Sequence, residues 1–159
     1  MRSSSHNLVK GVLAMEIKQV IGTENTVYPD ALAIRKTVFI EEQGVDADLE
    51  LDHQDEDTKH YVAYVGGEAV ATARLKPLFN KRVRIQRVAT LKQHRRNGYN
   101  TQVIKRVLAD ARAEDFYEAV LDAQETAIGF YEKMGFEVVS EPFLEAGIRH
   151  RKMMYRLDD

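Results

Sequence analysis

Apolar and polar residues alternate most clearly just after residue 82. There Val83 and Ile85 are apolar, and the residue after each of them is polar. This period of two is typical of a strand with one buried face. The alternation slips at Arg87, which stands where an apolar residue is due, and Val88 and Ala89 then follow consecutively. One extra residue opposite a single partner produces a β-bulge, which leaves backbone N–H and C=O groups free for a ligand. The pattern therefore predicts a central strand with a bulge at Arg87.

Other periodicities predict elements on both sides of this strand. A helix is expected from Tyr28 to about Gln43, because Pro29 suits a first turn and apolar residues recur on one face. Two apolar runs separated by Gly66-Gly67-Glu68 indicate a hairpin. The full set of further elements is a strand from Met15, hairpin strands His60–Val65 and Ala69–Leu75, a helix over 101–113, a strand Phe116–Ala123, a helix Ala127–Met134 capped by Gly135, and strands Phe136–Ser140 and Arg149–Arg156.

This order predicts an α/β fold (α+β in some schemes), with a mixed central sheet of about six to seven strands flanked by helices. Most strands are expected to be antiparallel because short turns join them. One parallel pair is expected between the strands that begin at Val83 and Phe116, because the helix over 101–113 crosses between them.

The first residues precede a second methionine, Met15, from which the strand pattern begins. We interpret residues 1–14 as a leader, either flexible or vector-derived, and residues 15–159 as a single domain. Apolar residues in the leader, Leu8, Val9, Val12 and Leu13, have helical spacing and allow a helical turn or two to dock on the domain.

A basic turn follows the central strand. His94, Arg95 and Arg96 bring positive charge, Gly98 removes a side chain, and a helical apolar pattern begins at Val103. A helix start presents unpaired N–H groups and roughly half a positive charge, while arginines supply charged hydrogen-bond donors. The turn is therefore a candidate anion-binding site, although a solvated basic turn that only caps a helix would have the same sequence.

Composition and charge exclude several classes of protein. A chain of 159 residues with 44% apolar and 30% charged residues is typical of one globular domain. The net charge of -2 argues against a partner nucleic acid bound by overall charge. The absence of cysteines excludes a disulfide, a thiolate metal site and a cysteine nucleophile. No apolar run reaches the ~18 residues of a membrane span, so we expect a cytoplasmic protein without a membrane partner.

Residues 95 to 100, Arg-Arg-Asn-Gly-Tyr-Asn, resemble the pyrophosphate loop R-G-x-G-x-G or A of the GNAT superfamily of acyl-CoA-dependent N-acetyltransferases. Two small positions differ, with Arg96 where glycine is usual and Asn100 where glycine or alanine is usual. Three further segments are similar to the ElaA-like and YjcF-like branch: I-R-K-T-V-F-I-E-E-Q-G-V, L-E-L-D, and L-D-A-Q-E-T-A-I-G-F-Y-E-K-M-G-F followed by E-A-G-I-R-H. The resemblance covers most of residues 15 to 157.

The resemblance implies that the parallel strand pair splays apart at the functional site. It also implies acetyl-CoA as cosubstrate, no metal, and a set of residues around the cofactor. The backbone of Val88, Ala89 and Thr90 would pair with the pantetheine arm as an added strand, which a bulge at Arg87 permits. The residues expected around the pyrophosphate are Gln93, Arg95, Arg96, Gly98, Asn100 and Thr101. Gln124 stands where many members carry asparagine and would reach the cofactor.

Tyr131 matches the usual general acid of the family, which would protonate the leaving thiolate. A phenol with an ordinary pKa of ~10 suits a thiolate of similar basicity. The helix alone favours Tyr131 as a core residue, since it lies on the apolar face with Ala127 and Phe130. The resemblance favours the acid.

The base is less defined. An alkylamine with a pKa near ~10.4 must lose a proton before it attacks. Glu42, His60, Gln86 and His150 are candidates to bind or deprotonate it. Each has a structural alternative: Glu42 as a solvated helix-end charge, His60 and Gln86 as polar strand residues, and His150 as the start of the closing strand. Some members of the superfamily need no dedicated base.

Seven acidic residues lie between Asp46 and Asp57. A calcium loop is rejected because Leu51 stands where an EF-hand needs glycine and the last ligand position is Asp57. The run is either a solvated loop or a wall that attracts a cationic substrate. On the second interpretation we expect a small cationic amine as acceptor, or else a basic peptide, with residues 141–150 forming a lid.

The resulting prediction is an enzyme that moves an acetyl group from acetyl-CoA to a primary amine by direct attack in a ternary complex. The alternative is a non-catalytic CoA-binding sensor or interaction module on the same fold. The altered positions Arg96 and Asn100 favour the alternative, and Tyr131 favours the enzyme. A homodimer is left open.

Overall fold

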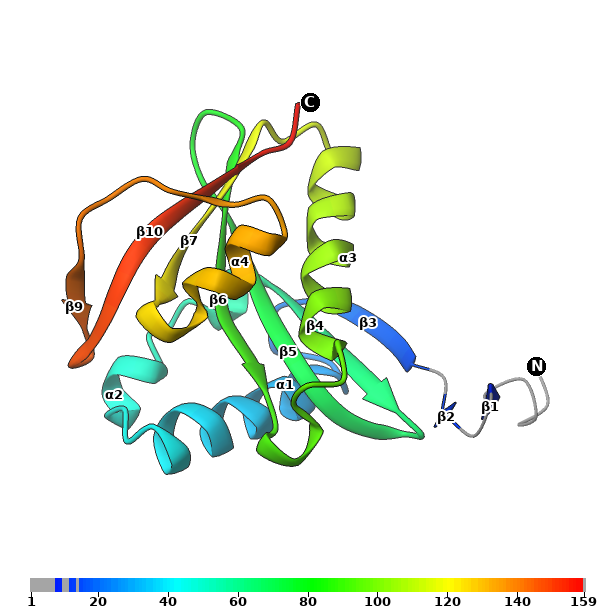
Figure 1. The fold of residues 1–159 in the computed structure, drawn as a ribbon. Coiled ribbons are helices and arrows are strands. Elements are labelled where there is room, and N and C mark those ends of the chain that lie inside the picture. The colour runs from blue at the N-terminus through cyan, green and yellow to red at the C-terminus, as the bar shows by residue number, and fades with distance from the viewer. Residues whose placement is uncertain (1–7, 10–11, 14, 159) are drawn as a thin grey trace.

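The computed structural model describes residues 8–9, 12–13 and 15–158, and a central sheet organises it (Figure 1). The eight-stranded sheet has the order β3-β4-β5-β6-β7-β10-β8, and β9 pairs with β10 outside that path. Its strands are β3 (Met15–Ile21), β4 (Lys59–Val65), β5 (Glu68–Pro77), β6 (Arg82–Thr90), β7 (Glu118–Gln124), β8 (Glu137–Val138), β9 (Phe143–Glu145) and β10 (Ile148–Arg156). The predicted mixed sheet is confirmed, and the short strand β9, which the sequence did not predict, raises the strand count above the expected six to seven.

Strands β6 and β7 form the expected parallel pair, and the other pairings of this sheet are antiparallel. Among the described residues, β6 and β7 are paired from Arg82 opposite Glu118 to Ile85 opposite Leu121. Both strands continue beyond these positions, β6 to Thr90 and β7 to its last residue. The strands therefore diverge after Ile85, as predicted for the functional site.

The bulge predicted at Arg87 is confirmed by the register of β5 and β6. Thr72 lies opposite Ala89, whereas Arg74 lies opposite Gln86, so one residue of β5 faces two residues of β6. Arg87 itself has a φ of 55°, in the left-handed region that a residue with a side chain rarely adopts. The bulge turns the following backbone toward the gap between β6 and β7.

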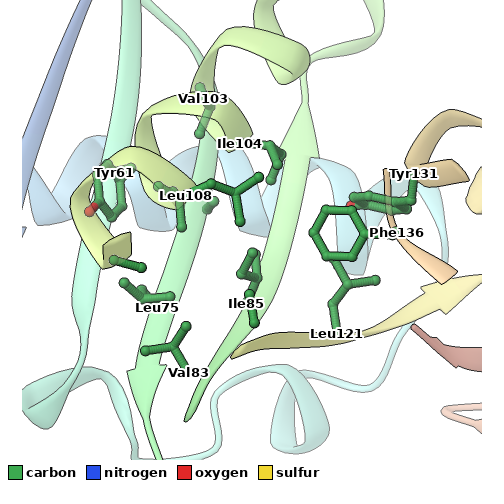
Figure 2. Packing of buried hydrophobic residues seen from close by; sticks show 14 of the residues in the cluster. Tyr61, Leu75, Val83, Ile85, Val103, Ile104, Leu108, Leu121, Tyr131 and Phe136 are labelled. Atoms are coloured by element: carbon green, nitrogen blue, oxygen red, sulfur yellow. The ribbon is translucent and has the colours of Figure 1, made fainter. Parts of the chain in front are cut away.

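Helices cover both faces of the sheet (Figure 1). On one face lie α3 (Tyr99–Ala113) and α4 (Ile128–Lys133), and Figure 2 shows Ile104 and Leu108 of α3 packed near Ile85 of β6. On the opposite face α1 (Tyr28–Arg35) packs Ala31 and Ile34 against a second buried cluster. Alternation along each strand supplies apolar residues to both clusters.

The helix predicted from Tyr28 is present but changes its winding. After α1 it continues as a π-helix, η2 (Lys36–Glu42), in which the Gln43 N–H donates to the Val38 carbonyl at 3.0 Å. The acidic run that follows is not a plain loop, because it contains two short helical turns. The remaining short elements are α2 (Ala47–Glu50), η3 (Asp55–Asp57), η4 (Lys92–His94) and η5 (Glu125–Ala127).

Two expected segments have a different local structure. Within 141–150, β9 forms a hairpin with β10 in which Phe143 lies opposite His150, and its role as a lid stays a prediction. Of the residues expected to form a helical turn, β1 (Leu8–Val9) pairs antiparallel with β2 (Val12–Leu13), so these four residues are extended. Among the described residues, no helix combines the length and apolar character that crossing a membrane requires.

Candidate active site

A cleft of about 890 Å³ opens where β6 and β7 diverge. Its walls come from η2 and α2 on one side, the start of α3 and α4 on another, and β10 at the far end. Arg84, Gln86 and Val88 line it from β6, and Asp122 and Gln124 line it from β7. Residues far apart in the sequence therefore meet at the point where the sheet is open.

Most of the predicted site residues meet in this cleft, and the others lie around or outside it. The residues that line it are Gln86, Val88, Arg95, Arg96, Asn100, Gln124, Tyr131 and His150. The predicted residues outside its lining are Glu42, His60, Ala89, Thr90, Gln93, Gly98 and Thr101. Ala89 and Thr90 were predicted to act through their backbone, and their side chains are buried. Thr101 instead lines a smaller hollow of about 420 Å³ with residues of α3 and α4.

The basic turn leads into α3 as the sequence predicted. Gly98 has a φ of 78° and precedes the first residue of the helix. Arg96 has a φ of 67°, a conformation that favours glycine, which explains why a glycine is usual at this position of the family loop. Asn100, in the first turn of α3, has a buried side-chain oxygen without a hydrogen-bond partner in the structure. The start of α3 thus combines helix N–H groups, arginines and an unpaired amide.

Tyr131 lies inside the cleft wall and is only 6% exposed. Its ring packs edge-on against Phe130 and Phe136, at centroid distances of 5.0 and 5.5 Å, close to Leu121 in Figure 2. Burial raises the pKa of the Tyr131 phenol above its ordinary value, so the hydroxyl keeps its proton at neutral pH. Between residues 15 and 158 the structure gives this hydroxyl no hydrogen-bond partner.

Glu42 is not suited to act as a base. Its carboxylate accepts two hydrogen bonds from Arg95, at 2.7 and 2.6 Å. These bonds lower the pKa of Glu42, and its side chain is not part of the cleft lining. Arg95, which was predicted to bind pyrophosphate, is therefore paired with a carboxylate at the cleft edge, and this pairing argues against Glu42 as the base.

The surroundings of His60 also argue against it as the base. The residue is 1% exposed and lies outside the cleft lining. Its Nε2 lies 2.9 Å from the carbonyl oxygen of Asp55, which can only accept, so Nε2 carries a proton and donates it. Burial lowers the pKa of His60. The ring is a neutral structural residue that also packs against Tyr28.

His150, like Gln86, is a base candidate that the structure places in the cleft. Its Nδ1 lies 2.7 Å from the carbonyl oxygen of Ile148, and the ring stacks on Phe143 at 6.0 Å. Because a carbonyl only accepts, Nδ1 is the protonated nitrogen, and Nε2 of the neutral ring keeps a free lone pair. The hairpin of β9 and β10 thus fixes the tautomer that a base requires.

Three of the seven acids in the acidic run, Glu50, Asp52 and Asp55, are paired with arginines, whereas Asp46, Asp48, Glu56 and Asp57 are exposed. Glu50 and Asp55 are 2% and 7% exposed. Arg35 pairs with both of them, at 3.0 and 2.9 Å, and Arg74 pairs with Asp55 and Asp52 at 2.8 Å. Burial alone would raise the pKa of Asp55, but hydrogen bonds from Tyr28 and the arginines hold it well below its ordinary value.

The same cluster anchors the bulge. Arg87 donates to Glu50 and Asp52, at 2.8 and 3.2 Å, so the residue in left-handed conformation is tied to α2. Gln86 accepts hydrogen bonds from Arg74 at 3.2 and 2.9 Å. Its side-chain oxygen is therefore committed to the cluster, which weakens the case for Gln86 as a base.

Sequence reasoning missed several cleft residues. Gln43 accepts a hydrogen bond from Gln124 at 2.9 Å and so joins η2 to β7 across the cleft. Phe39 lines the same side. Arg84 and Asp122 project from the sheet face opposite α3, and the alternation with core residues along β6 and β7 is the signal that could have identified both.

Comparison with known proteins places these features in a family. Residues 17–157 match the acetyltransferase (GNAT) domain. The chain is 36% identical over 144 residues to YjcF of Bacillus subtilis, described as an uncharacterised N-acetyltransferase, and the match covers 87% of this chain and 99% of YjcF.

Two crystal structures are similar along almost their whole length. A protein from Lactobacillus plantarum has a TM-score of 0.84 at 30% identity, with 90% of this chain and 98% of that chain covered. ElaA of Escherichia coli has a TM-score of 0.75 at 26% identity, with 88% and 98% covered.

Proposed function

This chain belongs to the GNAT family of acetyltransferases, and we propose that it transfers an acetyl group from acetyl-CoA to a primary amine. The resemblance to the ElaA-like and YjcF-like branch is confirmed. The single observation that carries the proposal is the divergence of β6 and β7 beyond Ile85, beside a bulge and beneath Tyr131. A pantetheine arm needs this combination of unpaired strand edge and open cleft.

The residues of the cleft fit CoA. The edge of β6 after the bulge offers N–H and C=O groups to an extended arm, in the manner of an added strand. Arg96 and the N–H groups at the start of α3 supply donors for phosphate. The unpaired amide of Asn100 supplies a further donor when it rotates by a half-turn, which exchanges the positions of its oxygen and nitrogen. The altered loop positions therefore add donors at the mouth of the cleft.

The proposed reaction is direct attack in a ternary complex. The neutral amine nitrogen forms a bond to the thioester carbonyl carbon, and the carbonyl oxygen gains negative charge that backbone N–H groups at the bulge stabilise. The C–S bond then breaks, and the CoA thiolate takes the proton of the Tyr131 hydroxyl. The attacking nitrogen gives up its proton to Nε2 of His150, directly or through water. Tyr131 and His150 line the same cleft.

Binding of CoA should stabilise the protein against heat. A ligand that binds only the folded state adds about 2.7 kcal/mol at a hundredfold excess over its Kd. Arg95→Ala should reduce this stabilisation and its dependence on salt, as measured by thermal unfolding with and without CoA. An unchanged melting temperature in millimolar CoA would overturn the proposal. Stabilisation by CoA without acetylation of any amine would identify the sensor or interaction module instead.

Glu42→Gln should tighten CoA binding roughly two- to fivefold at low salt, the range expected for a partly exposed ion pair. The carboxylate competes with phosphate for Arg95, and its charge repels the ligand. Calorimetric titration of CoA measures the change, and Glu41→Gln removes the same charge from an exposed neighbour as a control. Weaker binding in Glu42→Gln alone would show that Glu42 positions Arg95 for the phosphate.

A further inference from the structure

Arg84 is an unpaired cation in the wall of the cleft. It lies on β6 between Val83 and Ile85, which are 0% and 2% exposed in the core, so its side chain projects from the opposite face of the sheet. Its Nε is buried without a hydrogen-bond partner. Within residues 15–158, its guanidinium has neither an ion pair nor a hydrogen bond. A buried charged donor without a partner is costly unless a ligand supplies one.

The other arginines of this face are fully matched by acids. Arg35, Arg74 and Arg87 form ion pairs with Glu50, Asp52 and Asp55, which gives three cations and three anions in one cluster. No carboxylate of that cluster is left over for Arg84. The expectation of a cationic acceptor rested on the acidic run. The residues that this run contributes to the cleft lining, Glu50 and Asp52, are both paired with arginines.

The remaining charges on this face do not neutralise Arg84. Val120 lies opposite it in the register of β7. Asp122, two positions further along, has its carboxylate 3.8 Å from Nζ of Lys152 and is not within ion-pair distance of Arg84. Glu145 lines the cleft from the exposed β9 hairpin. Among the described residues, no carboxylate therefore lies within ion-pair distance of Arg84, and Asp122 lies near Lys152 instead.

We propose that Arg84 binds an anionic group of the acceptor, so that the acceptor is a primary amine that also carries a carboxylate or phosphate. The inference rests on the proposed acetyl transfer and deepens it. A guanidinium binds both groups through paired N–H donors. A cationic acceptor such as a polyamine would instead meet an unbalanced positive charge.

The position of Arg84 also sets the length of the acceptor. Val88, beside which the thioester would lie, is four residues further along β6, about 13 Å at ~3.3 Å per residue. The long side chain of Arg84 shortens this gap without closing it. The amine and the anionic group should therefore be separated by several bonds, as in an ω-amino acid or an aminoalkyl phosphate, and α-amino groups should be poor acceptors.

The test compares acceptors of matched length: δ-aminovalerate, aminobutyl phosphate, n-pentylamine and cadaverine. The wild type should acetylate δ-aminovalerate or aminobutyl phosphate with a kcat/KM roughly 10- to 100-fold above that of n-pentylamine, the range of one charge-assisted contact. Arg84→Gln should remove the preference through KM. Arg82→Gln removes the same charge from the same strand, outside the cleft lining, and should keep the preference. The better of the two acid-bearing amines identifies carboxylate or phosphate.

Calorimetric titration of δ-aminovalerate and aminobutyl phosphate into the CoA-bound protein separates the two proposals. Binding to wild type and Arg82→Gln but not to Arg84→Gln supports the role of Arg84, even if no amine is acetylated and the proposed reaction fails. Acetylation of n-pentylamine or cadaverine as fast as the acid-bearing amines would overturn the role of Arg84 and leave the reaction standing. Failure of the wild type to bind or acetylate either acid-bearing amine would also overturn it.

Discussion

Replacing Arg35 by methionine is expected to lower the free energy of unfolding by about 3–5 kcal/mol, the cost of breaking a buried ion pair from one side. Arg35 is 1% exposed and binds Glu50 and Asp55, which are themselves buried. Methionine fills much of the volume, so the loss is mainly electrostatic. Each acid keeps one other arginine, Arg87 for Glu50 and Arg74 for Asp55, which places the expected loss within that range rather than above it.

Chemical denaturation of Arg35→Met and of Arg82→Met measures this difference. Arg82 pairs with Glu118 at 2.8 Å, but its side chain is 40% exposed, so its loss should cost under about 1 kcal/mol. At ~2–4 °C per kcal/mol for a domain of this size, the melting temperature of Arg35→Met should fall by roughly 6–20 °C. Equal losses in the two variants would show that the buried cluster contributes no more than a surface ion pair.

The acid dependence of stability gives a second measurement on the same variant. The pKa of Asp55 is held below its ordinary value of 3.8, so its contribution is fully present above pH 3.8 and is lost as the pH falls through the lower folded-state value. Removing Arg35 removes one cause of that depression, and burial then works against the charged form. Arg35→Met should therefore lose less stability than the wild type as the pH falls below 3.8, although it is the less stable protein at neutral pH.

This cluster also shows what the sequence does not reveal. Its members come from α1, α2, η3, β5 and β6, and no local pattern connects residues so far apart. The acidic run was visible, but its partners were not, so both a solvated loop and a cation-attracting wall were reasonable interpretations. The base candidates Glu42 and His60 illustrate the same point, because their hydrogen-bond partners decide their chemistry, and these partners depend on tertiary structure.

Features encoded within a few residues were predictable. The shift in the alternation at Arg87 identified the bulge, because a strand that keeps one face buried can accommodate an extra residue only by bulging. The Gly66-Gly67 turn identified the β4–β5 hairpin, and both glycines have positive φ, 59° and 85°, as a two-residue hairpin turn requires. The β9–β10 hairpin was missed because Ala146-Gly147 is a weaker turn signal and β9 has three residues.

Replacing Tyr131 by phenylalanine is expected to lower kcat by roughly 10- to 1000-fold, with little change in KM for acetyl-CoA, because a proton donor acts in the transition state. The hydroxyl lines the cleft and has no partner within residues 15–158, while the ring packs against Phe130 and Phe136. Phenylalanine keeps this packing. The melting temperature should therefore remain near that of the wild type.

Tyr61→Phe is the matched control for Tyr131→Phe, because it removes a buried phenol hydroxyl far from the chemistry. Tyr61 is 0% exposed, and its hydroxyl donates to Asp110 at 2.8 Å, outside the cleft lining. Its loss should lower stability by about 1 kcal/mol, the net value of one hydrogen bond, and leave kcat unchanged. Steady-state kinetics and thermal unfolding of both variants should thus give opposite signatures. If Tyr131→Phe retains full kcat and loses stability instead, Tyr131 is a core residue, and the proton for the thiolate must come from another group in the cleft or from water.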